Sequence, residues 1–596
     1  MAEISMGPGL PTHSEADWLS AVDKVLRGKS FDNLITSDID GITRHPLYTD
    51  ASHATNDATS GLPGIAPFIR GAQALSNKHL PWHIAQRVVV GRGAADNDHI
   101  LTDLAGGVSA LLLDCTETNT IDASALDDLL DGVMLDIAPI ALIPGSNETR
   151  AIDAFLDVLK RRYPQTNDIK AYLNHDPFAT ALASQAPVET GFIAPLCIHA
   201  NAYPNVGLMT ASGAAFHNQG AAPSDELGYM LAALAENLRL LERAGLAPPD
   251  ALPRIPLTLS IDTDFFGTIA KIRSARNLFH MLAKHVGGTK IAPVIHCETS
   301  QRAYSRLDPW VNILRATVSA LAGGVAGADM ICVSPCSATS ESDNTLTRRI
   351  ARNTQIILQE ESHIAHVSDA AGGSWYVETL TQELSDKAWS LFQEIEAAGG
   401  LIEHMNSGAV HAQLDARCRT YENQVDTRTL PLVGVSEYPN LDEAPLAAPD
   451  VAQNGYRYAE KFEALRDRAE RVKPRVYLAC LGDAAAFTPR ANFAANIYAT
   501  GGVHAISGSG GFDIDDIVRA FADSGAKIAV ICGVDDDYDA HATQLSEALR
   551  AAGCVHIALA GQPRDIASID DYCYAGGPAF AFVQHVLVKL GLEIDA

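Results

Sequence analysis

Residues 256–285, PLTLSIDTDFFGTIAKIRSARNLFHMLAKH, contain one complete unit of the pattern that sets the fold. Pro256–Asp262 is a short apolar run of the kind that forms a buried strand. Phe265–His285 follows it with apolar residues at helical spacing. A short apolar strand joined directly to a helix is typical of parallel strands connected by crossover helices. This unit therefore predicts an α/β protein.

Eight such apolar runs occur in the first two thirds of the chain, and stretches of helical period separate most of them. The expected strands are Arg87–Gly91, Val108–Cys115, Ile137–Ile143, Ile169–Asp176, Phe192–His199, Pro256–Asp262, Ile291–Glu298 and Asp329–Ser334. The expected helices include Asn147–Arg162, Asp225–Ala244, Phe265–His285 and Asp308–Leu321. Eight β/α alternations in about 250 residues predict a TIM barrel.

The flanking sequence predicts three more regions. The pattern between Trp18 and Leu26 is helical within an otherwise extended, Pro-rich and Gly-rich segment. Further expected elements are helices at Asn344–Glu361, Leu380–Ala398 and Tyr456–Val472, and strands at Arg475–Leu481, Gly502–Ile506, Lys527–Cys532, Val555–Ala560 and Asp571–Ala575. Five strands alternating with helices are typical of a doubly wound, flavodoxin-like domain. We therefore expect an N-terminal arm at 1–80, a TIM barrel with C-terminal helices at 81–426, a linker at 427–474 and a flavodoxin-like domain at 475–596.

Composition excludes several classes of protein. With 47 % apolar and 19 % charged residues, the 596-residue chain can bury a sizeable core, so a mainly disordered protein is excluded. Its 44 basic and 72 acidic residues give a formal net charge of −28, which repels nucleic acid and anionic membranes. The ten cysteines are dilute and unpatterned, and no secretory signal or long apolar run is found. We expect a cytoplasmic protein with reduced thiols, and neither nucleic acid nor a membrane as partner.

Polar residues close most of the apolar runs of the barrel, and barrel enzymes place their chemistry where the strands end. These residues are Asp114, His175, Asp176, His199, Asp262, Asp264, His296 and Glu298. Taken alone, they predict a hydrolase with His175, His199 and His296 as metal ligands and a carboxylate as general base. The alternative is that they cap loops and helices, since the three histidines lack the spacing of a metal motif.

The C-terminal region contains one glycine-rich loop, Gly508-Ser509-Gly510-Gly511, ahead of an expected helix. Such a loop can cradle a phosphate at a helix N-terminus. Here it follows the second strand of the domain, not the first, and no Lys-Ser or Lys-Thr pair closes it, so a turn with a helix cap is the preferred interpretation. The sequence also lacks Gly-x-Ser-x-Gly and His-Glu-x-x-His, so no motif supports serine or zinc hydrolase chemistry.

Several segments in order make the chain resemble the methylmalonyl-CoA mutase family. They are Asp40-Gly41-Ile42, Pro46-Leu47-Tyr48-Thr49, Pro63 to Gly71, Pro81-Trp82, Asp264-Phe265-Phe266, Ala270 to Arg273, Cys297-Glu298-Thr299-Ser300, Ala351-Arg352-Asn353-Thr354-Gln355, Gln359-Glu360-Glu361, Gly372 to Glu378 and Val433-Gly434-Val435. The resemblance covers nearly the whole chain. It implies an arm, a TIM barrel that threads an acyl-CoA, and a flavodoxin-like domain that holds cobalamin.

The cobalt ligand of that family is missing. Members that bind cobalamin carry Asp-x-His-x-x-Gly after the first strand of the C-terminal domain, where the imidazole ligates cobalt and the carboxylate orients it. This chain instead has Gly482-Asp483-Ala484-Ala485-Ala486-Phe487-Thr488-Pro489-Arg490, and no histidine occurs between Arg475 and Val503. No shift of alignment restores the ligand.

The barrel lacks the family's catalytic side chains at three further places. Gly213-Ala214-Ala215 stands where catalytic chains have Gly-Tyr-His, ahead of Asp225-Glu226-Leu227. The segment between Arg70-Gly71 and Pro81-Trp82 contains no tyrosine, and Val325 to Asp329 replaces Thr-Gln-Ser-Leu-His. Together with the missing histidine, these differences make the chain resemble the small, non-catalytic subunit, which pairs with a large subunit of the same fold.

Our leading hypothesis is the small subunit of a heterodimeric, adenosylcobalamin-dependent methylmalonyl-CoA mutase, which interconverts methylmalonyl-CoA and succinyl-CoA. The large subunit is expected to bind the cofactor and the acyl-CoA, and the arm to lie across it. We name no catalytic, cofactor-binding or metal-binding residue in this chain. Three alternatives stay open: a subunit of a related acyl-CoA mutase, a diverged barrel enzyme with metal-assisted acid–base chemistry at the strand ends, and a regulatory or chaperone-like binder of the catalytic chain.

Overall fold

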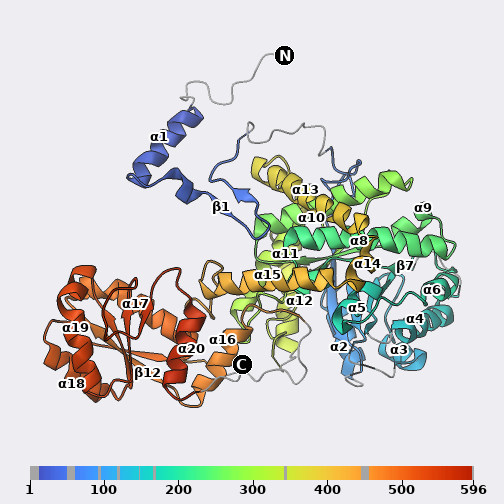
Figure 1. Ribbon diagram of the computed structural model, residues 1–596. Helices are drawn as coiled ribbons and strands as arrows, with labels where there is room; N and C mark the ends of the chain where they lie inside the picture. Colours follow the sequence, from blue (N-terminus) through green and yellow to red (C-terminus); the bar gives the residue numbers. More distant parts are fainter. Residues whose placement is uncertain are drawn as a thin grey trace.

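A computed structural model describes residues 13–49, 61–91, 95–116, 118, 121–145, 148–164, 169–199, 201–340, 345–443 and 455–592. Parts of the expected arm (1–12 and 50–60) and of the expected linker (444–454) lie outside these residues. Figure 1 shows a barrel surrounded by helices, a smaller α/β domain beside it, and an N-terminal segment that projects away from both.

The barrel consists of parallel strands that close on themselves. They are β3 (His83–Val89), β4 (Ala110–Asp114), β5 (Ile140–Ile143), β6 (Ala171–His175), β7 (Gly207–Met209), β8 (Ala211–Ser212), β9 (Leu257–Ile261), β10 (Ile295–Thr299) and β11 (Met330–Cys332), in the order β7-β6-β5-β4-β3-β11-β10-β9-β8. Only Thr210 separates β7 from β8, and its N–H donates to the His175 carbonyl of β6 at 3.2 Å. The two short strands are halves of one interrupted strand, and the TIM barrel prediction is confirmed.

The prediction of the fifth strand is wrong. Phe192–His199 contains α6 (Ile193–His199), and the strand follows it at residues 207–212. Pro195 has no N–H for a ladder inside a sheet but is tolerated in the first turn of a helix. Ile193 and Leu196 are buried on one face while Ile198 is 74 % exposed, which is the burial of a surface helix.

All the expected helices of the barrel are found, but the limits of Asp308–Leu321 and Leu380–Ala398 differ from those observed by up to four and five residues. The helices of the barrel are α2 (Ala95–Ala105), α3 (Ala123–Leu129), α4 (Glu148–Arg162), α5 (Pro177–Ser184), α7 (Ala214–Asn218), α8 (Pro223–Arg243), α9 (Pro248–Ala251), α10 (Phe265–His285), α11 (Val311–Val325), α12 (Thr345–Glu360), α13 (Trp375–Ala397), α14 (Leu401–Asn406) and α15 (Ala409–Asp426). The side chain of Asp264 accepts the N–H of Gly267 and thereby starts α10.

Buried ion pairs join α10 to α13 and to the N-terminal segment. Arg273 has no exposed surface, and it pairs with Glu378 of α13 at 2.6 Å and with Asp369. Arg70, within one of the segments that carries the family resemblance, pairs with the same Asp369 at 2.7 Å. Removing one partner from such a cluster leaves an uncompensated buried charge, so these residues hold the three segments together.

The C-terminal domain has a parallel five-stranded sheet. Its strands are β12 (Arg475–Cys480), β13 (His504–Ser507), β14 (Ile528–Cys532), β15 (His556–Ala560) and β16 (Asp571–Cys573), in the order β13-β12-β14-β15-β16. Helices α17 (Ala484–Thr500), α18 (Ile514–Ser524), α19 (Asp535–Ala551) and α20 (Ala579–Lys589) cover it, with one apolar core on each face. This is the flavodoxin-like order, and that prediction is confirmed.

The two domains meet through α15, α16 (Glu460–Glu470) and α20, which lie between them in Figure 1. The rings of Phe462 and Phe580 pack edge to face, with centroids 5.5 Å apart. The N–H of Phe580 donates to the Asp426 carboxylate at the end of α15. The domains therefore share a packed junction.

The N-terminal segment touches the barrel at its far end but not at its helix. Arg44, in the short strand β2 (Thr43–Arg44), pairs with Asp264 at the start of α10, at 2.7 Å. Helix α1 (Glu15–Leu26) has no buried residue, and Figure 1 shows it standing away from the barrel. Its Ser14 and Asp17 form a capping box, which gives the helix a defined start.

All ten cysteines lie within the described residues, and each is free. Among the helices described there, none combines the length and the apolar content that crossing a bilayer requires.

We predict that Arg273→Met destabilises the barrel by about 3–5 kcal/mol, because Glu378 and Asp369 lose a fully buried cation. Tryptophan fluorescence during urea unfolding measures this selectively, since all five tryptophans lie between Trp18 and Trp389. The control is Lys160→Met, which removes an exposed pair with Asp157 on α4 and should cost less than about 1 kcal/mol. Equal effects of the two variants would contradict a structural role for the buried cluster.

Candidate functional site

Several of the predicted strand-end residues do lie where their strands end, and they have local partners. Asp114 ends β4 and pairs with Arg87 of β3 at 3.0 Å. His175 ends β6 and lies 2.9 Å from Glu148. Asp176 caps α5 through the Ala179 N–H, and burial together with the charge of Glu148 raises its pKa to about 7.

The remaining predicted residues are divided between both ends of the barrel. Asp262 follows β9, and Asp264 caps α10. His296 is only the second residue of β10, so the expectation that it closes the strand is wrong. Its ring packs edge to face on Tyr172 with centroids 4.4 Å apart, and burial lowers its pKa to about 3. Glu298 lies near the end of the same strand, and burial raises its pKa.

Among the side chains that the structure describes, the barrel histidines do not form the expected metal site. His199 belongs to α6 and not to a strand, and its side chain lies outside the described residues. Within the described ranges, the one group of three potential metal ligands is in the C-terminal domain, far along the chain from the predicted set. His175 and His296 are engaged by Glu148 and Tyr172 respectively.

The carboxyl end of the barrel instead holds a buried charged cluster that sequence reasoning missed. Glu226 of α8 accepts a hydrogen bond from Lys271 of α10 at 2.6 Å and from the Ser260 N–H of β9 at 2.7 Å. His217 of α7 lies 3.2 Å from the Glu226 carboxylate and 2.7 Å from the Ser300 hydroxyl. We call these residues, with Arg302, the mouth cluster.

Burial and pairing fix the charge states of the mouth cluster. Burial opposes ionisation of Glu226, but Lys271 and His217 outweigh it and hold the pKa of Glu226 well below its usual range. Burial and the neighbouring Arg302 lower the pKa of His217 to about 4, so the ring is neutral at pH 7. Every side chain of the cluster is at least 95 % buried. These groups neutralise one another and are shielded from solvent, so the cluster is built to hold structure more than to exchange protons with a substrate.

Aromatic residues from two later segments cover the cluster. The Arg302 guanidinium lies 4.9 Å from the ring centroid of Tyr421 on α15 and 5.8 Å from that of Tyr458 in the expected linker. The Tyr458 N–H donates to the Arg302 carbonyl at 2.9 Å. The chain just before α16 therefore lies directly on the loop that follows β10. A lysine inside the apolar pattern of Phe265–His285 was the available sequence signal for this cluster.

In the C-terminal domain, the segment after β12 forms the start of a helix. Asp483 accepts the Ala486 N–H and is the N-cap of α17. Gly482 has a φ of +83° and forms a bridge with Gly511, through hydrogen bonds of 3.1 and 2.8 Å in the two directions. The glycine-rich loop thus folds back on the end of β12, and Gly510 lies directly against the Phe487 ring.

A cavity of about 320 Å³ lies at the junction of the domains. Tyr456, Phe462 and Phe580 contribute apolar surface, and Lys461 and Glu422 are among its charged walls. The volume is at the low end of the range of about 300–1,000 Å³ for small-ligand sites.

Comparison with known proteins agrees with the resemblance in the sequence. Residues 37–129 and 124–508 match the family described as "Methylmalonyl-CoA mutase". The chain is 36 % identical to the methylmalonyl-CoA mutase small subunit of Streptomyces virginiae, over 99 % of this chain and 98 % of that protein. It is 36 % identical to the probable small subunit of Mycobacterium tuberculosis, over 94 % and 93 % of the two chains. It is 31 % identical to the methylmalonyl-CoA mutase small subunit of Propionibacterium freudenreichii subsp. shermanii, over 94 % of this chain and 90 % of that protein. The chain therefore belongs to the methylmalonyl-CoA mutase family, among relatives that are named small subunits.

Proposed function

We propose that this chain is the small subunit of a heterodimeric, adenosylcobalamin-dependent methylmalonyl-CoA mutase. In this proposal the large subunit binds the cofactor and interconverts methylmalonyl-CoA and succinyl-CoA, while this chain supports it and is inactive alone. The main support is the segment after β12, where Asp483 caps a helix and no histidine is available to ligate cobalt. The complex would act in the cytoplasm.

The residues present do not fit cobalamin. To hold the cobalt, the chain would need an imidazole at the carboxyl edge of the sheet, oriented by a hydrogen bond to its other nitrogen. At this edge Ala484, Ala485 and Ala486 form the first turn of α17, and alanine offers no ligand atom. The cavity between the domains is small for a corrin, which is larger than a drug-sized ligand.

The barrel also favours a supporting role. Small and large apolar side chains meet inside it and form a core cluster of Ala85, Ala110, Leu112, Ala141, Met330 and Cys332, with Ile143 and Tyr172 packed against them. His296 adds a buried ring beside Tyr172. Side chains that fill the axis leave less room for the thioester arm of an acyl-CoA. This packing supports placing the acyl-CoA in the partner.

The N-terminal helix supports the heterodimer. Trp18, Val22 and Val25 follow the i, i+4, i+7 spacing of an apolar stripe, yet no residue of α1 is buried and Val25 is 80 % exposed. Trp18 packs edge to face on Phe31, with ring centroids 6.1 Å apart, but the described residues leave the stripe largely uncovered, and such a stripe is suited to a surface on another chain. The large subunit is the partner that the names of the relatives imply.

We predict that the purified chain alone does not bind adenosylcobalamin, whereas the pair with its large subunit binds one corrin per heterodimer. Titration followed by visible absorbance reports any change in the lower ligand of cobalt. Asp483→Asn keeps a good N-cap and should leave corrin binding by the pair unchanged, because this carboxylate orients no ligand. Tight corrin binding by the lone chain would refute the proposed division of labour.

We predict that the double variant Val22→Asp, Val25→Asp weakens association with the large subunit at least about tenfold, which corresponds to about 1.4 kcal/mol. Two apolar side chains that become buried in an interface would contribute at least this much. Sedimentation equilibrium of the mixed subunits measures the change.

The matched control is Val22→Ile, Val25→Ile, which keeps the apolar stripe and should associate normally. Unfolding of the lone chain should be unaffected by either change, since α1 has no buried residue. If both double variants associate like the original chain, α1 is not part of the interface.

A further inference from the structure

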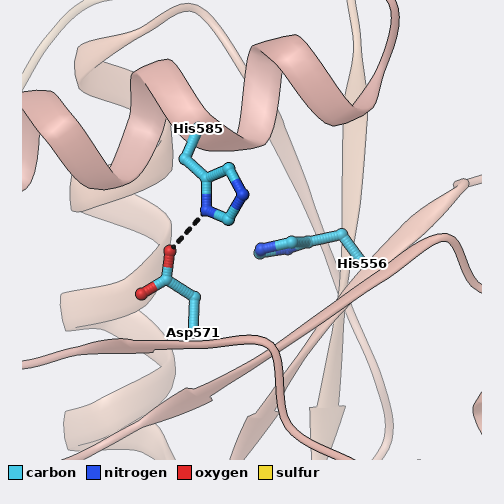
Figure 2. Close-up of side chains that lie close together, drawn as sticks. All are labelled: His556, Asp571 and His585. Atoms are coloured by element: carbon cyan, nitrogen blue, oxygen red, sulfur yellow. Dashed lines mark hydrogen bonds and ion pairs between the residues drawn. The ribbon is translucent and has the colours of Figure 1, made fainter.

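Three potential metal ligands meet on the side of the C-terminal sheet that α20 covers. His556 begins β15, Asp571 begins the neighbouring edge strand β16, and His585 lies in the middle of α20. Figure 2 shows the three side chains pointing toward a common space between the helix and the two strands. One ligand atom from each lies within 4.8 Å of the others, and His585 Nδ1 is 3.1 Å from Asp571 Oδ2.

His556 is buried with its hydrogen-bonding groups unsatisfied by the described residues. Its side chain is fully buried, and neither ring nitrogen has a hydrogen-bond partner among the residues that the structure describes. An imidazole that loses its water contacts without replacement destabilises the fold, so such a group calls for a partner. Its ring stands nearly perpendicular to that of His585, with centroids 5.4 Å apart, and in Figure 2 it is directed at the His585–Asp571 pair.

We propose that His556, Asp571 and His585 form a zinc site. Two imidazole nitrogens and a carboxylate oxygen, with water as the fourth ligand, are a common tetrahedral set for zinc. In such a set neighbouring ligand atoms are about 3.3–3.5 Å apart, as two bonds of about 2.0–2.1 Å at a tetrahedral angle require. His585 Nδ1 and Asp571 Oδ2, at 3.1 Å, lie slightly closer together than this spacing, and the other contacts, all within 4.8 Å, would shorten by up to about 1.5 Å to complete it.

The protonation state of His556 and the partial exposure of His585 and Asp571 are suited to binding a metal ion. Burial lowers the pKa of His556 to about 4, so its ring has a lone pair to donate at pH 7. Zinc would bind at Nδ1 of His585, and the neutral ring would then carry its single proton on Nε2, as the other tautomer. The side chains of His585 and Asp571 are 42 % and 28 % exposed, so an ion can enter from this side and keep a water ligand.

The proposed ion would have a structural role. It would join the last helix of the chain to the three-residue edge strand β16 and to β15. Two of the three ligands are the first residues of β15 and β16, so the site lies at the amino ends of the strands, whereas Asp483 follows the carboxyl end of β12. The proposal does not depend on the proposed function, and either can fail alone.

The test is a titration of the full-length, metal-free chain with Zn²⁺, followed by calorimetry and by thermal unfolding. We expect one zinc per chain, a midpoint of unfolding that rises with zinc concentration, and no such response to Mg²⁺, which prefers oxygen ligands. Co²⁺ as a spectroscopic probe should give the visible bands of a tetrahedral site without a thiolate charge-transfer band, since the set has no sulfur ligand.

His585→Gln and Asp571→Asn each remove a ligand from the exposed side of the site and should weaken zinc binding at least about tenfold. The matched control is His504→Gln, at the start of β13 at the other end of the same sheet. Circular dichroism of the variants checks that they fold. Absence of stoichiometric zinc, unchanged affinity in both ligand variants, or a cobalt–thiolate band from the nearby cysteines would overturn the proposal.

Discussion

The pairing of Glu226 with Lys271 is the interaction on which the carboxyl end of the barrel depends. A carboxylate with no exposed surface is tolerated only when a cation and hydrogen-bond donors replace the water it has lost. Lys271 comes from α10 and Ser260 from β9, so satisfying one charge fixes α8, α10 and a strand in a single arrangement. His217 and Arg302 extend the arrangement, and the tyrosines that pack on Arg302 then close this face of the barrel.

The need to pair buried charges also governs the rest of α10, which is buried on most of its circumference. Arg273 finds Glu378 and Asp369 on one side, while Arg276 donates to the carbonyl oxygen of Ala326 at the end of α11. Each cation selects a different neighbour, so the helix can be rotated or shifted only by breaking several buried pairs at once. The charged residues inside the apolar pattern thus fix the rotation and the position of α10 along its axis, which apolar packing alone would not fix.

Sequence reasoning succeeded where the pattern is local. Phe265–His285 was predicted at its observed limits because an aspartate cap precedes a long apolar period. The error at Phe192–His199 arose because a buried parallel strand and a short amphipathic helix can have the same composition, and only Pro195 distinguished them. Lys271 inside an apolar pattern signals a buried charge, but the partners in the mouth cluster and the His556 group could not be predicted, because they come from separate elements that meet only after the chain has folded.

The segment after β12, where the family resemblance leads us to expect a cobalt ligand, is ordered by its own helix cap. Asp483 caps α17, and the three alanines after it have high helix propensity and form its first turn. At the N-terminus, by contrast, α1 is capped but has only twelve residues and buries none of them. A helix of this length is marginal in water without tertiary contacts. The segment after β12 thus has its own helix cap, whereas α1 gains little stabilisation from the rest of the described chain.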